Sequence, residues 1–358
     1  MQEFLPKNYH MEKNLSLFIN GGSSIIYTLK KMDQERTKLL IVGSPKNFDG
    51  LISIGDLQRA IIRNIDLNTE ISHILRQGII VVSDNESREE IRKKMLKIRA
   101  EFMPVINSAN EVVDVLFWED IFETNEKRKD IMLNLPVVIM AGGKGSRLKP
   151  ITNVLPKPLI PIGAKTILEE IMDRFVRVGC NDFHFSVNYK AEMIKYYFDN
   201  LHNSDYDISY FQEEKPLGTA GSMYLLKDII KSTFFVSNCD IIIEQDLDDI
   251  YNYHKSNGNK ITIVSALKHY QIPYGTIETE ENGILSSLHE KPELTFQINT
   301  GVYILEPEVL LEIPDNTFFH ITELIDKIRN KKQKVGVFPV SEGAWKDIGD
   351  WSEYLKNI

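Results

Sequence analysis

The sequence has few cysteines, no excess of basic residues and no long apolar run. Its 358 residues include two cysteines, Cys180 and Cys239, whose spacing fits neither a disulfide framework nor a metal site. The formal net charge of −9 argues against a general nucleic-acid-binding protein, which is normally basic. No apolar run could span a bilayer, and the first residues lack the apolar core of a signal peptide. These absences predict a cytoplasmic protein that binds neither nucleic acid nor membrane.

Two familiar phosphate-binding motifs are also missing. The P-loop pattern G-x-x-x-x-G-K-[ST] does not occur, and the dinucleotide pattern G-x-G-x-x-G fails because Leu148 stands where its third glycine belongs. None of the eight histidines lies in a metal-binding pattern. A nucleotide site, if present, must therefore be of another kind.

The stretch from Val137 to Gly163 holds the main candidate. An apolar run, Val137–Met140, predicts a strand buried on both faces, and a glycine-rich turn follows it. Ligands of α/β sheets bind beyond the carboxyl ends of strands. A turn that merely closes the strand is the alternative, but a proline-punctuated segment rich in cations argues for a polyphosphate site; the cations are Lys144, Arg147, Lys149 and Lys157.

The segments A-G-G-K-G-S-R-L-K-P and L-P-K-P-L-I-P-I-G resemble the nucleotide loop of sugar-1-phosphate nucleotidyltransferases. The resemblance implies that Arg147 is catalytic and binds the departing pyrophosphate, and that Lys157 is catalytic and binds the α-phosphate. It also implies that the turn contacts the nucleotide through Ala141, Gly142, Gly143, Gly145 and Ser146.

A second glycine turn occurs in P-L-G-T-A-G, just before a helical pattern. Such a turn is expected to offer free amides to an anion or a base edge. A capped helix with Thr219 as the cap is the alternative. In the resembling family this loop holds the nucleobase, which implies that role for Gly218, Thr219 and Ala220, together with Glu213.

Two aspartates are candidate magnesium ligands. Asp240 ends the apolar run Phe234–Asp240, so its carboxylate should face the ligand crevice; a turn-forming aspartate is the alternative. Mg²⁺ prefers one or two carboxylates plus substrate phosphate oxygens. The segment W-K-D-I-G resembles a family motif, which implies that Asp347 joins Asp240 on the metal, and the resemblance makes Asp240 a third catalytic residue beside Arg147 and Lys157.

Three further segments resemble the acceptor side of that family. Alone, each is more typical of a turn or a solvated charge. The resemblance implies that the sugar phosphate is contacted by Gly275, Glu290, Lys291, Asn299 and Thr300.

The pattern of elements after residue 134 alternates strand and helix. It predicts an α/β fold with a Rossmann-like, doubly wound, mostly parallel sheet, as in GT-A-like nucleotidyltransferases. We expect this catalytic domain over residues 135–358 and a charged linker over 123–134.

Residues 1–122 contain an internal repeat. Leu39–Asp56 and Met103–Asp120 both read as strand, turn, strand and a helix-opening aspartate, at an offset of 64 residues. The repeat resembles a tandem of CBS domains, α+β in class, over about 10–66 and 67–122. That implies an adenine nucleotide held by Ser53 and Asp56 and by Asp120, although Phe117 replaces the second Ser or Thr. Helix capping is the alternative for both aspartates. CBS pairs often associate, so a homodimer is expected.

Together the two resemblances cover nearly the whole chain. A CBS pair followed by a nucleotidyltransferase domain resembles the glucosamine-1-phosphate guanylyltransferases of bacterial legionaminic acid synthesis. They imply a Mg²⁺-dependent enzyme that transfers a nucleotidyl group from GTP to glucosamine-1-phosphate and releases pyrophosphate. The alternatives are UTP, dTTP or CTP as donor, and mannose-1-phosphate or another hexose-1-phosphate as acceptor. An alternative of another class is a non-catalytic nucleotide sensor.

Overall fold

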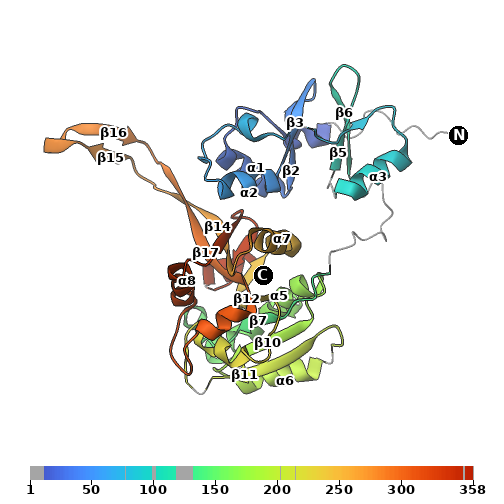
Figure 1. Ribbon diagram of the computed structural model, residues 1–358. Coiled ribbons are helices and arrows are strands. Elements are labelled where there is room, and N and C mark those ends of the chain that lie inside the picture. The colour runs from blue at the N-terminus through green and yellow to red at the C-terminus, as the bar shows by residue number, and fades with distance from the viewer. Residues whose placement is uncertain are drawn as a thin grey trace. The chain divides into compact units, whose positions relative to one another are not determined.

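The computed structural model describes residues 12–76, 78–98, 102–117, 132–201, 203–213, 215–349 and 351–357. The chain divides into two compact units, Met1–Lys129 and Asp130–Ile358, which are treated separately below (Figure 1). Asp120 and residues 123–131 of the expected linker lie outside the described ranges. Within these ranges no helix has the length and apolar character needed to cross a membrane.

The N-terminal unit holds two sheets of the same design. In each, a short first strand lies parallel to the second, and the second is antiparallel to the third, in the orders β1-β2-β3 and β4-β5-β6. The elements are η1 (Glu12–Leu17), β1 (Phe18–Ile19), α1 (Ile25–Glu35), β2 (Leu39–Ser44), β3 (Asn47–Ser53), α2 (Ile54–Ile62), η2 (Ile71–Ile74), β4 (Val82–Ser83), α3 (Arg88–Ile98), β5 (Phe102–Ile106) and β6 (Val112–Phe117).

The two copies join through their hairpins. The Phe48 amide donates to the Asn110 carbonyl at 3.1 Å, and the Val112 amide donates to the Pro45 carbonyl at 2.9 Å. One apolar cluster contains Ile41 from the first copy along with Phe102 and other residues of the second. Burying such side chains contributes roughly 2 kcal/mol each, so the duplicated halves stabilise one another.

A mixed seven-stranded sheet forms the centre of the C-terminal unit, in the order β11-β10-β7-β12-β17-β14-β18. The strands are β7 (Val137–Met140), β8 (Pro161–Ile162), β9 (Lys165–Thr166), β10 (Asp182–Val187), β11 (Asp207–Gln212), β12 (Phe234–Asn238), β13 (Ile241–Ile243), β14 (Ile261–Gln271), β15 (Thr276–Thr279), β16 (Leu285–His289), β17 (Glu293–Leu305), β18 (Val335–Val340) and β19 (Trp345–Asp347). The helices are η3 (Ser146–Leu148), η4 (Ile151–Asn153), η5 (Lys157–Leu159), α5 (Ile167–Val176), α6 (Ala191–Leu201), η6 (Gly221–Leu226), α7 (Leu247–Asn257), η7 (Glu281–Gly283), η8 (Pro307–Glu312), α8 (Ile321–Asn330) and α9 (Trp351–Asn357).

Parallel pairing predominates in this sheet but does not extend throughout it. Strands β11, β10, β7 and β12 pair in parallel, as does β14 with β18. Strand β17 is antiparallel to both β12 and β14, because it returns directly from the β14 hairpin. The expected mostly parallel α/β sheet is thus present, with one reversed strand inside it.

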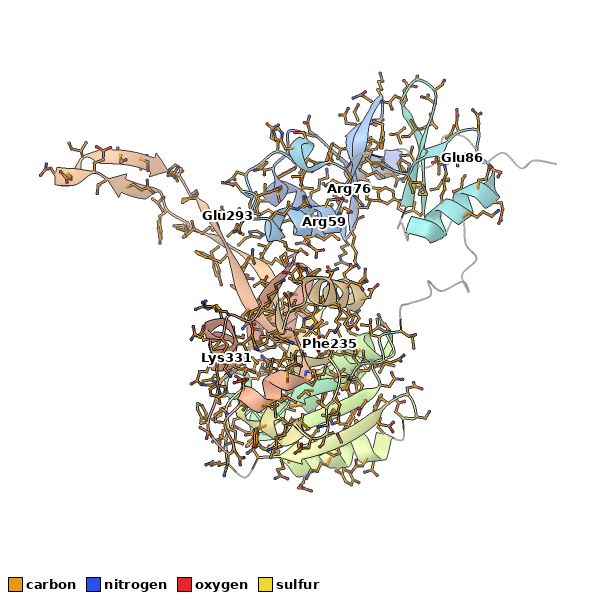
Figure 2. All side chains as sticks on the ribbon, in the orientation of Figure 1. Arg59, Arg76, Glu86, Phe235, Glu293 and Lys331 are labelled. Atoms are coloured by element: carbon orange, nitrogen blue, oxygen red, sulfur yellow. The ribbon has the colours of Figure 1, made fainter. Side chains whose placement is uncertain are left out.

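Helices cover both faces of the sheet, as the successive residues of β7 illustrate. Val137 and Ile139 belong to one buried cluster, with residues of α5, α6 and α7, whereas Val138 belongs to a second, with residues of η6 and α8. Successive strand residues point to opposite faces, so an apolar run without alternation is what two covered faces require. The buried Phe235 ring, labelled in Figure 2, packs edge-on against Phe175 of α5.

Helix α5 begins after a side-chain cap at Thr166. The Thr166 hydroxyl accepts from the Glu169 amide at 3.2 Å, and the Glu169 carboxylate accepts from the Thr166 amide at 2.8 Å, which forms a capping box. Beyond the helix, Gly179 adopts φ 74°, a left-handed conformation that favours glycine. Local signals therefore mark both ends of helix α5.

Strands β14 and β17 continue beyond the sheet as a two-stranded ribbon that ends in β15 and β16 (Figure 1). We call residues 267–297 the arm. Strand β18 pairs with β14 only as far as Ala266, and β12 pairs with β17 only from Val302 onward. In Figure 1 the arm projects away from the body of the C-terminal unit.

Candidate active site

The glycine turn after β7 packs against Thr152 and Lys157. Gly145 has φ 62°, and a Cβ atom built on it would lie 2.9 Å from Thr152 Cγ2 and 3.1 Å from Lys157 Cβ. Glycine is therefore required there on two counts, backbone conformation and space. Its carbonyl accepts from the Thr152 hydroxyl at 3.0 Å. The turn follows a fixed path directly above Lys157.

The backbone amides of this turn are available to a ligand. The Ala141 amide donates to Ser186 of β10 and the Leu148 amide to Gly145, but the amides of residues 142–147 have no protein acceptor within the described ranges. Consecutive unpaired amides at a strand end are suited to phosphate oxygens. The free amides favour the polyphosphate loop that the sequence predicts, which stays a prediction.

Lys157 and Asp240 meet beneath the turn. The Lys157 Nζ forms an ion pair with Asp240 Oδ2, and the two side chains are only 8% and 12% exposed. Arg147 Nη2 lies 4.0 Å from the same oxygen, but its side chain is 63% exposed and extends toward solvent. Three of the predicted catalytic groups, from β7's loop, η5 and the end of β12, therefore share one location.

Asp347 reaches the same place from the far end of the sequence. Strand β19 pairs antiparallel with β13, which sets Asp347 opposite Ile241, and the Ile348 amide donates to the Asp240 carbonyl at 2.9 Å. A Cβ atom on Gly349 would lie 2.5 Å from Asp347 Oδ1 and 2.9 Å from Arg147 Nη2. Gly349, which sequence reasoning missed, thus leaves the space that these two side chains occupy.

The surroundings of the Asp347 carboxyl disfavour its charged form. Its burial, and next the negative charge of Asp240, raise its pKa, while Lys157 and Arg147 act in the opposite direction. Its buried Oδ1 atom has no hydrogen-bond partner among the described residues. An unpartnered buried carboxylate oxygen beside a second carboxylate fits a divalent cation. In the described ranges no three acidic, His or Cys side chains are placed so that they could hold a metal ion together, so substrate oxygens or water would supply the remaining ligands.

The Glu213 carboxylate already accepts hydrogen bonds from other protein groups. It accepts from the Ser186 hydroxyl at 3.2 Å and from the Leu217 amide at 3.0 Å, and it lies 3.9 Å from the position of a Cβ atom on Gly142. The side-chain amide of Asn188 donates to the backbone carbonyl of Glu213 at 3.2 Å. Glu213 therefore connects the first glycine turn to the second and leaves little capacity for a base.

The second glycine turn differs from the expectation of free amides. The amides of Ala220 and Gly221 both donate to the Phe319 carbonyl, at 3.0 and 3.1 Å. The Thr219 hydroxyl accepts from the Ile321 amide at 3.0 Å, so it caps α8 and not the helix that follows it in sequence. Gly218 has φ 79° and packs against Phe319. The free-amide interpretation was wrong for residues 220 and 221, because a segment distant in sequence supplies their acceptor.

The acceptor residues fall into two groups. Asn299 and Thr300 lie near the end of β12: the Thr300 hydroxyl donates to the Val264 carbonyl at 2.8 Å, and Gly301 packs against Asn238, two residues before Asp240. Gly275, Glu290 and Lys291 lie instead on the arm, which points away from the sheet (Figure 1). The first group therefore lies beside the end of β12, and the second lies on the arm.

In the N-terminal unit, the capping alternative for Asp56 is what the structure contains. The Asp56 amide donates to the Ser53 hydroxyl at 3.3 Å, and the Asp56 carboxylate accepts from the Ser53 amide at 2.9 Å. The buried carboxylate also forms ion pairs with Arg59 and Arg76, whose side chains are 49% and 59% exposed (Figure 2). Sequence reasoning missed these two arginines, because no motif links them to Asp56.

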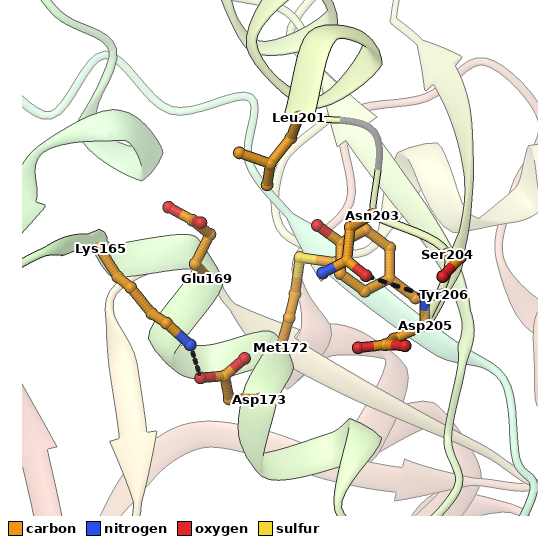
Figure 3. A pocket seen from close by; sticks show the side chains of 9 residues that line it. All are labelled: Lys165, Glu169, Met172, Asp173, Leu201, Asn203, Ser204, Asp205 and Tyr206. Carbon is orange, nitrogen blue, oxygen red and sulfur yellow. Dashed lines mark hydrogen bonds and ion pairs between the residues drawn. The ribbon is translucent and has the colours of Figure 1, made fainter.

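A hollow in the surface lies apart from these residues. Its volume is about 430 Å³, and it runs beside α5 and the loop before β11 (Figure 3). Lys165 and Asp173 form an ion pair there, and Glu169 accepts from the Tyr197 hydroxyl at 2.8 Å. None of the predicted site residues lines this hollow. Lys165, Asp173 and Glu169 are thus engaged with protein groups, whereas the buried Tyr206 hydroxyl has no hydrogen-bond partner among the described residues.

The comparisons with known proteins agree with this geometry. A family model described as nucleotidyl transferase matches residues 136–358. The mannose-1-phosphate guanyltransferase of Schizosaccharomyces pombe is 33% identical over 229 residues, 62% of each chain, and the mannose-1-phosphate guanylyltransferase catalytic subunit beta of Dictyostelium discoideum is 30% identical over 230 residues, 63% of this chain and 64% of that protein. The chain thus spans less than two thirds of the curated relatives it matches.

Solved structures carry the same fold. HddC from Yersinia pseudotuberculosis is 26% identical, with a TM-score of 0.50 over 62% of this chain and 97% of that one. A putative glucose-1-phosphate thymidylyltransferase from Bacillus anthracis, 18% identical with a TM-score of 0.50, shares the fold over 62% of this chain and 93% of its own. Because the family model covers more than half of the chain and the site residues converge at the same sheet edge, the chain belongs to the nucleotidyl transferase family.

Proposed function

We propose that the C-terminal unit transfers a nucleotidyl group from a nucleoside triphosphate to a sugar-1-phosphate. The observation that carries this proposal is the convergence of Lys157, Arg147, Asp240 and Asp347 beside the unpaired amides of residues 142–147. An acidic protein concentrates cations and amides here, where a triphosphate needs them.

The reaction requires positioning more than proton transfer. A phosphate oxygen of the sugar-1-phosphate attacks the α-phosphorus, a new P–O bond forms, the bond to the β-phosphate breaks, and pyrophosphate leaves. Lys157, fixed by its ion pair, would orient the α-phosphate, and exposed Arg147 would follow the departing pyrophosphate. Asp240 and Asp347 would hold Mg²⁺, which neutralises phosphate charge when bound.

Guanine is the base that we favour. The curated relatives from Schizosaccharomyces pombe and Dictyostelium discoideum are both named for guanylyl transfer to mannose-1-phosphate. The resemblance of the whole chain to legionaminic acid enzymes favours glucosamine-1-phosphate as the acceptor, and the relatives' names support mannose-1-phosphate as the alternative.

A matrix of substrates tests the proposal. GTP, UTP, dTTP and CTP are each incubated with glucosamine-, mannose- and glucose-1-phosphate in the presence of Mg²⁺, and pyrophosphate release is measured. We expect turnover with GTP and at least one hexose-1-phosphate. Binding of nucleotide without pyrophosphate release in any combination would support the non-catalytic sensor instead.

For the N-terminal unit we propose an adenine-nucleotide site in the first copy. Arg59 and Arg76 offer half-exposed guanidinium donors to a phosphate group beside Ser53. Calorimetry with AMP, ADP and ATP tests it. No heat of binding for any of the three would leave this unit a structural module.

A further inference from the structure

The loop that carries Lys157 is held by side chains from outside it. Residues 149–161 contain four prolines, which have no backbone N–H to donate, and this limits the hydrogen bonds that the loop can form within itself. Several carbonyl groups of the loop accept from side chains of other segments instead. Two more of these donors lie on one short helix, α9.

Helix α9 contacts both ends of this loop. The Trp351 indole Nε1–H donates to the Lys149 carbonyl at 2.7 Å, and the Tyr354 hydroxyl donates to the Pro161 carbonyl at 3.0 Å. Lys157 lies between these two carbonyls in the sequence. The Tyr354 side chain is buried in the main apolar cluster, and the Trp351 ring packs edge-on against it with ring centroids 5.8 Å apart. Packing therefore holds both donors where the loop needs them.

The segment that leads into α9 contacts the other side of the crevice. It begins with Asp347, and the amide of the fully buried Ile348 donates to the Asp240 carbonyl at 2.9 Å. Gly349 leaves the space beside Arg147 Nη2. A single short segment thus contacts the expected metal ligands on one side and, through α9, both ends of the loop on the other.

We propose that Trp351 and Tyr354 are positioning residues, which hold Lys157 at the distance from the metal ligands that a bound triphosphate requires. The proposal rests on the proposed function. Each of the two side chains acts through a backbone carbonyl of the loop and not through contact with substrate. In-line attack depends on such support, because a misplacement of about 1 Å can slow a reaction about 10²-fold.

The ion pair between Lys157 and Asp240 cannot set this distance throughout the reaction. The proposed function assigns the lysine to the α-phosphate and the aspartate to Mg²⁺, so both groups exchange their mutual contact for ligand contacts. Hydrogen bonds that take no part in the chemistry keep the loop in place during that exchange. Those from α9 meet this requirement, because their donors and acceptors lie outside the pair.

Two conservative substitutions test the proposal. Tyr354→Phe removes only the hydroxyl, and Trp351→Phe removes the indole N–H while it keeps an aromatic ring in the cluster. In each variant kcat/KM for the triphosphate should fall about tenfold, and in the double variant about 10²-fold. The KM for the sugar-1-phosphate should change less than about twofold, because Asn299 and Thr300 lie on β17 and not on the loop.

A purely structural role is the alternative. It predicts a lower melting temperature for the variants and unchanged kinetic constants when the assay is run well below that temperature. Thermal unfolding is therefore followed for every variant alongside pyrophosphate release. A double variant whose kinetic constants stay within about twofold of the parent would overturn the proposal, and so would an equal loss in the KM for the sugar-1-phosphate.

Two matched controls change comparable groups that do not contact the loop. Tyr210→Phe deletes a hydroxyl that donates to Asp199 of α6 at 3.3 Å, and Leu355→Gln alters an exposed position on α9 itself. Both controls should keep every kinetic constant within about twofold of the parent. A tenfold loss in either control would overturn the assignment of the effect to Trp351 and Tyr354.

Calorimetry separates this proposal from the proposed function. GTP, UTP, dTTP and CTP are titrated in the presence of Mg²⁺ into the parent and the double variant, without a sugar-1-phosphate. The double variant should bind the preferred triphosphate at least about tenfold more weakly than the parent. Weaker binding together with a parent that turns over no substrate would refute the proposed function and retain the positioning role. Equal binding by parent and variant, or no binding by the parent, would overturn the positioning role.

Discussion

Lys157 and Asp240 form a buried ion pair although 83 residues separate them in the sequence. The pair joins the loop after β7 to the end of β12, two neighbouring parallel strands. Removing one partner of a buried pair leaves an uncompensated charge, which is far more costly than removing both.

This pair predicts that stability and activity can be separated. Lys157→Ala should lower the free energy of unfolding by about 3 kcal/mol and slow turnover by about 10²–10³-fold. The double variant Lys157→Met with Asp240→Asn should regain most of the lost stability and remain inactive. Denaturant titration and pyrophosphate release measure the two effects. Turnover within about threefold of the parent in Lys157→Ala would contradict its role at the α-phosphate.

The raised pKa of Asp347 predicts how the stability of the fold depends on pH. Because burial and Asp240 raise its pKa in the folded protein, the folded state holds this proton more tightly than the unfolded chain. Stability should therefore fall as pH rises from the ordinary value of 3.8 through the raised one, and the cost persists at neutral pH.

Asp347→Asn should accordingly raise the melting temperature at pH 7, with no difference at pH 3, while turnover falls at least tenfold. Millimolar Mg²⁺ should stabilise the parent but not this variant. Calorimetry at both pH values, with and without Mg²⁺, measures these shifts. A variant less stable than the parent at pH 7 would show that Asp347 serves the fold instead of a cation.

The glycine turn predicts a contrast between two neighbouring substitutions. Gly145→Ala places a Cβ atom 2.9 Å from Thr152 Cγ2 at φ 62°, so it should cost at least about 1 kcal/mol and raise the KM for the triphosphate. At Gly143 a Cβ atom meets no atom within 4 Å, so Gly143→Ala should leave the melting temperature unchanged. Equal stability of the two variants would contradict this account of the turn.

The start of α8 should require the hydroxyl of Thr219, a cap that the sequence does not reveal. Thr219→Val removes the acceptor of the Ile321 amide at the start of α8 and should cost about 1 kcal/mol. Thr219→Ser keeps the hydroxyl and should stay within about 0.5 kcal/mol of the parent. Thermal unfolding of both variants provides the comparison, and equal losses would exclude the cap.

Local patterns carried most of the fold and the nucleotide side of the site. The run Val137–Met140 and the glycines after it each act within a few residues, so their structure follows from their order. What could not be predicted depends on contacts between distant segments. The Phe319 carbonyl consumes the amides of Ala220 and Gly221, and Arg59 and Arg76 converge on Asp56.

The direction of the arm was equally inaccessible from the sequence. The segments around Gly275 and Glu290 read as turns beside a site, and nothing in their order indicates that the ribbon continues outward from the sheet. Asp240 and Asp347 could be associated only through family resemblance, because their proximity depends on β13 and β19 pairing.

That last pairing has a consequence for a chain still being made. Glu244 and Lys346, which meet across the β13–β19 ladder, are 102 residues apart. Synthesis proceeds from the amino terminus. A nascent polypeptide therefore exposes Asp240 before Asp347 is added, so the expected pair of metal ligands is incomplete until the chain has grown beyond β19.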